Sequence, residues 1–293
     1  MFRGSLVALV TPMKSDLSID YDALSALVDW HIESGTHGLV VMGTTGESSL
    51  VSVDEHVAVV KAVIEQVDKR IPVIAGCGSA STSKAVELVN QLNQLQPDGF
   101  LCVTPYYLKP TQNGLYAHFS AVADACEAPL ILYNVPGRTC CDLADETVAR
   151  LSSHPKIVAI KDATGDLERA KNLIEKVPGF IYLSGDDATA LDFMALGGHG
   201  VISVTGNIVP KEFSQFCDLM AKKQPESTQK AKELFNRINS LNSALFVESN
   251  PIPVKWALAK VGRMEPYLRL PLTQPEPASQ QVIQAAMQQS AVI

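Results

Sequence analysis

Short apolar runs alternate with amphipathic stretches along most of the chain. The runs are rich in valine, isoleucine and leucine and contain few polar residues. Strands that are buried on both faces, as in a parallel sheet, have this composition. We therefore predict eight strands, which lie within residues 5–10, 38–43, 71–76, 99–104, 129–134, 157–161, 181–185 and 200–204.

The stretches between these runs predict helices. Residues 53–67 repeat apolar residues at helical spacing, and Ser52 with Glu55 forms a capping box before them. The face that we expect this helix to bury consists of Val57, Val60, Ile64 and Val67. The other helices predicted between strands lie at residues 20–34, 82–95, 112–126, 145–153, 166–177, 186–196 and 207–222.

The repeated alternation of strand and helix predicts an α/β fold, a closed (β/α)8 TIM barrel. An open, doubly wound sheet is the alternative, but a glycine-rich phosphate loop usually follows its first strand, and here that strand continues as "VTPMKSD". Three more helices are predicted after the barrel, near residues 226–246, 251–262 and 276–290. We therefore expect a catalytic barrel over residues 1–222 and a C-terminal helical subdomain over residues 223–293.

The composition of the chain argues against several classes of protein. A net charge of −7 and the lack of a strongly basic run argue against nucleic acid as a partner. No apolar run reaches the roughly 20 residues that cross a membrane, and the N-terminal run ends at Thr11-Pro12 without a cleavage site. The six cysteines show no zinc spacing. We expect a cytoplasmic protein with free, buried thiols and no metal.

One apolar run ends directly in a lysine, Lys161. A buried lysine loses hydration, so its side chain ordinarily reaches the surface or pairs with a nearby acid such as Asp162. In a barrel, however, the active site lies at the C-terminal ends of the strands, and other polar residues follow the other runs at that end. The residues expected on this rim with the lysine are Thr44, Thr45, Tyr107, Tyr133 and Arg138.

These side chains could act together in a reaction at a carbonyl carbon. A desolvated lysine has its pKa lowered from about 10.4, and its free amine can form a Schiff base with a carbonyl compound. Tyr133 can move protons, and Thr44 with Tyr107 can pass them to water. Backbone N–H groups in the turn "GTTGE" can hold one carboxylate, and Arg138 a second. Each residue alone has a purely structural alternative, and their coincidence at one end favours the catalytic interpretation.

Four segments together resemble a known family. They are "GTTGES" (43–48), "TPYY" (104–107), "YNVPGRT" (133–139) and "IKDATG" (160–165). They resemble the class I pyruvate-dependent aldolases, and most closely the dihydrodipicolinate synthase family, along nearly the whole chain. The resemblance implies that pyruvate condenses with L-aspartate 4-semialdehyde to give 4-hydroxy-tetrahydrodipicolinate, in diaminopimelate and lysine biosynthesis. It implies no metal or organic cofactor, and a homotetramer built as a dimer of dimers.

The resemblance also implies roles for the rim residues. Lys161 forms the Schiff base with pyruvate, and Tyr133 donates and accepts protons. Thr44 and Tyr107 complete a proton relay, with Tyr107 reaching into the site of a neighbouring subunit. The residues implied in substrate binding are Thr45 and the backbone at Gly185 and Ile202 for pyruvate, and Arg138 for the carboxylate of the aldehyde.

Two alternatives stay open. N-acetylneuraminate lyase and the sugar-acid aldolases and dehydratases share the lysine and the tyrosine, but the sialic-acid enzymes tend to lack an arginine at position 138. A catalytically silent binding barrel is the alternative from another class, because a fold does not determine a function. We expect such a protein to have lost at least one of Lys161, Tyr133 and Arg138, and all three are present.

The resemblance finally implies a regulatory cleft for L-lysine. Its positions in this chain are Ser48, Ser49, His56, Ala80, Lys84 and Tyr106. In inhibited members the position of Lys84 is typically a glutamate, and that of Ala80 an asparagine. A lysine there repels the ammonium of the ligand, unless its side chain turns into solvent. We therefore predict weak sensitivity or insensitivity to L-lysine.

Overall fold

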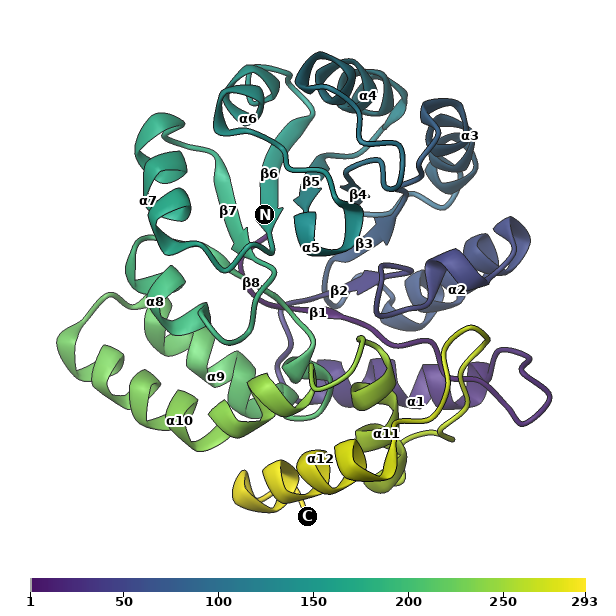
Figure 1. Ribbon diagram of the computed structural model, residues 1–293, viewed down its shortest axis with the longest axis vertical. Helices are drawn as coiled ribbons and strands as arrows, with labels where there is room; N and C mark the ends of the chain where they lie inside the picture. The colour runs from purple at the N-terminus through teal and green to yellow at the C-terminus, as the bar shows by residue number, and fades with distance from the viewer. Residues whose placement is uncertain (1) are drawn as a thin grey trace.

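The computed structural model describes residues 2–293 as a closed barrel of eight parallel strands, paired in the order β1 to β8, with β8 returning to β1 (Figure 1). All eight strands overlap the predicted runs, so the TIM barrel is confirmed. The strands are β1 Gly4–Ala8, β2 Gly38–Val41, β3 Val73–Gly76, β4 Gly99–Val103, β5 Leu130–Asn134, β6 Ile157–Asp162, β7 Ile181–Ser184 and β8 Gly200–Ser203.

Helices surround the barrel at nearly the predicted positions. Those between strands are α1 Tyr21–Glu33, α2 Val53–Val67, α3 Thr82–Asn93, α4 Gln112–Ala125, α5 Pro136–Thr139, α6 Asp145–Leu151, α7 Leu167–Lys176 and α8 Ala190–Ala195, and α9 Pro210–Ala221 follows β8. The sequence did not predict the short helix α5 or the 3-10 turns η1 Ser48–Leu50 and η2 Thr205–Asn207. These three elements follow strand ends, where a few residues carry no periodic signal.

The buried face of α2 differs from the prediction. The capping box at Ser52 is present, but Val57 and Ile64 are only half-buried. The face turned to the barrel consists of His56, Val59, Val60, Val63 and Val67. Both sets have helical spacing and share Val60 and Val67, and in the buried set the His56 ring forms a hydrogen bond with the Gly76 carbonyl of β3, at 2.8 Å.

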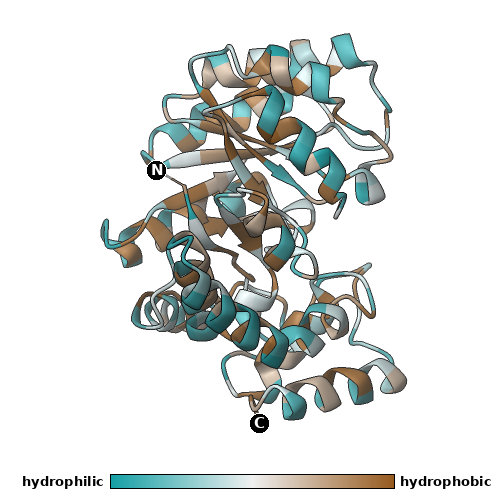
Figure 2. Ribbon diagram, turned by 90° about the vertical axis from the view of Figure 1, so that its left-hand side faces the viewer, coloured by the Kyte–Doolittle hydropathy of each residue, from teal (hydrophilic) through white to brown (hydrophobic). Residues whose placement is uncertain are grey.

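Alternate residues of each strand enter two different cores. One set, including Leu6, Val40 and Ile131, fills the inside of the barrel, and the other packs against the helices. The strands are accordingly coloured mostly as hydrophobic in Figure 2. Tyr133 and Ala159 belong to the inner set. Side chains two residues apart share a face of a strand, so Lys161 also points into the barrel.

Three further helices complete the chain: α10 Pro225–Ala244, α11 Ile252–Lys260 and α12 Pro277–Gln289. They share a core with β8, α8 and α9, and α12 packs against α10 and α11 (Figure 1). The division into a barrel over 1–222 and a subdomain over 223–293 stays a prediction. Within residues 2–293, each helix is too short or too polar to cross a membrane.

Candidate active site

Lys161 lies inside the barrel near the C-terminal end of β6, and it is 6% exposed. In the sheet it is paired with Tyr133 of β5. Its Nζ lies 4.2 Å from the centroid of the Tyr133 ring. Two neighbouring strands therefore place an amine and a phenol together, as the sequence predicted.

The alternative explanation of the lysine, an ion pair with Asp162, is wrong. Asp162 alternates to the other face of β6, where its carboxylate pairs with Arg169 Nε at 3.1 Å and accepts a hydrogen bond from the Thr164 backbone N–H at 2.9 Å. Within residues 2–293, no ion pair or hydrogen bond engages Lys161 Nζ. The amine is buried without a counter-charge, and its nitrogen is available for chemistry.

Gly185, which follows β7, gives the lysine its space. A Cβ atom at this position would lie 2.8 Å from Lys161 Cε and 2.7 Å from Ala163 Cβ, closer than side chains pack. Ile202 is buried in β8 and belongs to the inner core of the barrel, with Tyr133. Two of the positions assigned to the pyruvate pocket therefore lie on, or directly after, the strands that follow β6 around the barrel.

The turn after β2 carries the two predicted threonines. Thr44 is half-buried, whereas Thr45 is buried and its Oγ1 accepts a hydrogen bond from Asn250 Nδ2 at 2.9 Å. Arg138, in α5, is exposed, and its Nη2 donates to the Asn250 carbonyl at 3.2 Å. Asn250 thus joins both predicted binding residues. The sequence pattern does not predict this residue, because it lies 112 residues from Arg138 along the chain.

A cavity of about 390 Å³ opens beside these residues. It brings three predicted active-site residues together with five of the six predicted cleft positions: Thr44, Tyr133, Arg138, Ser48, Ser49, His56, Lys84 and Tyr106. The predicted residues outside its wall are Thr45, Tyr107, Lys161, Gly185, Ile202 and Ala80. One continuous hollow therefore connects the mouth of the barrel with the cleft.

Tyr107 stands apart from the other rim residues. Its side chain is 87% exposed, and its backbone has φ +74°, a left-handed conformation that is uncommon outside glycine. It lies in the segment after β4, next to the exposed Leu108. Within its own chain, Tyr107 is not brought to Lys161.

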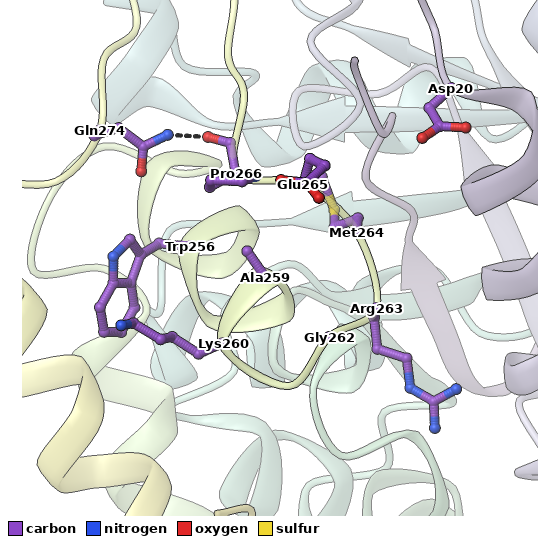
Figure 3. Close-up of a pocket in the computed structure, with 10 residues that line it drawn as sticks. All are labelled: Asp20, Trp256, Ala259, Lys260, Gly262, Arg263, Met264, Glu265, Pro266 and Gln274. Atoms are coloured by element: carbon purple, nitrogen blue, oxygen red, sulfur yellow. Dashed lines mark hydrogen bonds between the residues drawn. The ribbon is translucent and has the colours of Figure 1, made fainter. Parts of the chain in front are cut away.

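A larger hollow of about 480 Å³ lies elsewhere, along α11 and the segment that follows it (Figure 3). Lys260 Nζ lies 4.8 Å from the centroid of the Trp256 ring, and the Gln274 amide donates to the Pro266 carbonyl. None of the predicted site residues lines this hollow.

Across residues 2–293, no group of three histidine, cysteine or acidic side chains is arranged to hold an ion. Burial lowers the pKa of His56, whose ring already bonds the Gly76 carbonyl. Five of the six free cysteines are buried as predicted, and Cys140 is exposed, because it follows the short α5 at the surface.

Comparisons with known proteins all find members of one family. The model of the family described as "Dihydrodipicolinate synthetase family" matches residues 1–290. The 4-hydroxy-tetrahydrodipicolinate synthase of Pseudoalteromonas atlantica is 52% identical over 297 residues, covering 100% of both chains. The chloride-inhibited dihydrodipicolinate synthase of Acinetobacter baumannii, solved with pyruvate, is 49% identical with a TM-score of 0.97, and 100% of each chain is covered.

A third similar structure is a monomeric dihydrodipicolinate synthase variant. It is 38% identical, with a TM-score of 0.95, over 100% of this chain and 98% of that one. The similarity in fold therefore extends to a protein described as a monomer.

Proposed function

The chain belongs to the dihydrodipicolinate synthetase family, and we propose that Lys161 is the residue on which its reaction proceeds. The protein is a lyase that condenses pyruvate with L-aspartate 4-semialdehyde, in lysine and diaminopimelate biosynthesis. Pyruvate is held as a Schiff base on a lysine, without an external cofactor. One observation carries the assignment: Lys161 is buried at the catalytic end of the barrel, against Tyr133 and without an acidic partner.

The reaction begins with attack of Lys161 Nζ on C2 of pyruvate. Water leaves, and a protonated imine remains as an electron sink. Loss of a methyl proton then gives an enamine, and its carbon attacks the aldehyde carbon of the second substrate. The amine of that substrate adds to the imine carbon, Lys161 leaves and the ring closes. Tyr133 is placed to move the protons, and Thr44 lies in the same cavity to pass them on.

Two further groups hold the substrates in this proposal. Thr45 and the backbone near Gly185 and Ile202 bind the pyruvate carboxylate. Arg138 binds the carboxylate of the aldehyde, and its contact with the Asn250 carbonyl keeps its guanidinium at the cavity wall.

Trapping with borohydride tests the assignment. The protein is incubated with pyruvate, reduced, digested and analysed by mass spectrometry. We expect a three-carbon adduct on Lys161, and an adduct on another lysine would contradict the assignment. A coupled assay with L-aspartate 4-semialdehyde then distinguishes this enzyme from aldolases that act on sugar acids.

The same proposal includes assembly and location. We propose a cytoplasmic homotetramer, built as a dimer of dimers, in which Tyr107 completes the proton relay of a neighbouring subunit. The exposure of Tyr107 and Leu108 supports this, since apolar side chains at the surface favour contact with another chain. An engineered monomer that keeps full activity would contradict the role of Tyr107.

Regulation is the last part of the proposal. Lys84 lies on the wall of the cavity with His56 and Tyr106, at the predicted L-lysine cleft. A cation in this wall opposes the binding of a cationic ligand, and we propose that L-lysine inhibits the enzyme weakly or not at all.

A further inference from the structure

The turn that carries Thr44 and Thr45 has an unusual backbone. Glu47 has φ +59°, in the left-handed region that favours glycine or asparagine. Its side chain is nevertheless a buried carboxylate with no exposed area. A left-handed backbone at a residue other than glycine costs free energy, and it persists where the surrounding contacts fix that residue. We therefore expect the Glu47 carboxylate to have a specific partner.

The partner comes from the C-terminal helices. Lys255, in α11, is 0% exposed, and its Nζ lies 2.5 Å from Glu47 Oε1. The other oxygen, Oε2, accepts a hydrogen bond from the Arg269 backbone N–H at 3.1 Å. Both carboxylate oxygens are therefore satisfied by residues more than 200 positions away in the sequence.

Lys255 also connects this turn to the end of β1. Its Nζ donates to the Thr11 carbonyl at 2.9 Å, while Thr11 Oγ1 donates to the Gly46 carbonyl at 2.7 Å. Gly46 lies so close to Thr11 and Met42 that a Cβ there would be 3.2 Å from each. One ammonium group thus holds two strand ends of the barrel together.

We propose that Lys255 is a positioning residue, which fixes the turn 43–48 and thereby sets the affinity for pyruvate. This inference rests on the proposed function, in which Thr45 binds the pyruvate carboxylate. Thr45 lies in the turn itself, whereas Arg138 touches the turn only indirectly, through Asn250, which contacts both residues. A loosened turn should therefore weaken the binding of pyruvate more than the binding of the second substrate.

The test compares two lysines on the same helix. Lys255→Met with Glu47→Gln removes both buried charges together, so that neither is left without a partner. Lys260→Met is the matched control, because Lys260 lies over the Trp256 ring and does not reach the turn. For each protein we would measure kcat, the KM for pyruvate and the KM for L-aspartate 4-semialdehyde. Borohydride trapping would give a fourth quantity, the pyruvate concentration at which half of the protein carries the adduct.

We expect the double variant to raise the KM for pyruvate and the half-trapping concentration by about tenfold or more, because small misplacements of binding groups are costly. The KM for the aldehyde should rise by a clearly smaller factor than the KM for pyruvate, and the control should match the wild type. Saturating pyruvate should still label Lys161 fully. A lower melting temperature with an unchanged KM for pyruvate would overturn the inference, since Lys255 would then only stabilise the fold.

If the double variant does not fold, Glu47→Gln alone provides the test, because it keeps the shape of the side chain and loses the charge. A rise of about threefold or more in the KM for pyruvate supports the inference, and no rise overturns it. A wild-type protein that is never trapped by pyruvate would instead show that the proposed function has failed, and the inference with it.

Discussion

Two buried lysines, Lys161 and Lys255, lie in this molecule under opposite conditions. Lys255 is enclosed between Glu47 and the Thr11 carbonyl, so its charge is compensated. Lys161 faces the ring of Tyr133, and in the part of the chain that the structure describes it pairs with no acid. Burial alone therefore does not distinguish a structural lysine from a reactive one.

The partners of each lysine make the distinction. The pKa of Lys255 is lowered from its usual value because burial outweighs the opposing effect of Glu47, which favours the charged ammonium. Within residues 2–293, Lys161 has no such acidic partner. The acid nearest to it in sequence, Asp162, is directed to Arg169 instead. The protein thus compensates one buried lysine and leaves the other available to a carbonyl carbon.

The largest expected effect is on turnover. Lys161→Ala should abolish the pyruvate adduct and lower kcat by a factor on the order of 10⁴ or more, because the nucleophile is removed. The Lys255 variants should still form the adduct. Mass spectrometry after borohydride reduction measures both. Adduct formation in Lys161→Ala would remove the distinction between the two lysines.

The sequence predicted one of these lysines and not the other. Lys161 was identified because it ends an apolar run, which is a local pattern, and the barrel then placed Tyr133 beside it. Lys255 lies in "NPIPVKWAL", where a lysine in a helix has an ordinary place at the surface. Its burial depends on packing against Glu47, 208 residues away. Periodicity carries no information on such contacts, and it missed Asn250 for the same reason.

Substitution of Lys255 should lower the stability of the fold more than substitution of Lys161, which is the reverse of their expected effects on turnover. Lys255→Met leaves Glu47 buried without its partner, and we expect the free energy of unfolding to fall by about 3–5 kcal/mol. Lys161→Met should leave this free energy unchanged or raise it, because an uncompensated amine is removed from an apolar site. Denaturant unfolding of the three proteins measures the difference. Equal losses in both variants would mean that Lys161 is also structural.

Arg138 extends the comparison to a cation at the surface of the site. Arg138→Ala should leave the pyruvate adduct intact and lower the use of L-aspartate 4-semialdehyde, by about 2–5 kcal/mol in kcat/KM if the contact is desolvated. Steady-state kinetics at saturating pyruvate measure this effect. A parallel loss of adduct and condensation would indicate a structural role through Asn250.

His31, like Lys161, is a buried basic side chain that pairs with no acid among the described residues. Burial, and then the charge of Arg263, lower its pKa from 6.5 to about 3. The folded protein therefore binds this proton less readily than the unfolded chain. The resulting stability is complete above pH 6.5 and is lost as the pH falls toward 3, by roughly 1.4 kcal/mol per pH unit. His31→Gln should remove roughly 2 kcal/mol of the difference between unfolding at pH 7 and pH 5.

The control for this experiment is His154→Gln, because it makes the same change of side chain at a histidine that reaches the surface and is not enclosed in the core. It should keep the pH dependence of the wild type. If His31→Gln also kept that dependence, His31 would not be the group that burial holds neutral.

Lys84 completes the comparison, because it is a lysine at the edge of a cavity and exposed to solvent. At about 4 Å, a bound ammonium would be repelled by roughly 1 kcal/mol in bulk water and about 4 kcal/mol at an effective dielectric constant of 20. We therefore expect initial rates at fixed substrate concentrations to change little with L-lysine. The double change Lys84→Glu and Ala80→Asn should create inhibition, since it exchanges a repelling charge for an attracting one. Half-inhibition of the wild type at submillimolar L-lysine would show that the Lys84 side chain turns away from the cleft into solvent. Its charge would then be screened and would not repel the ligand.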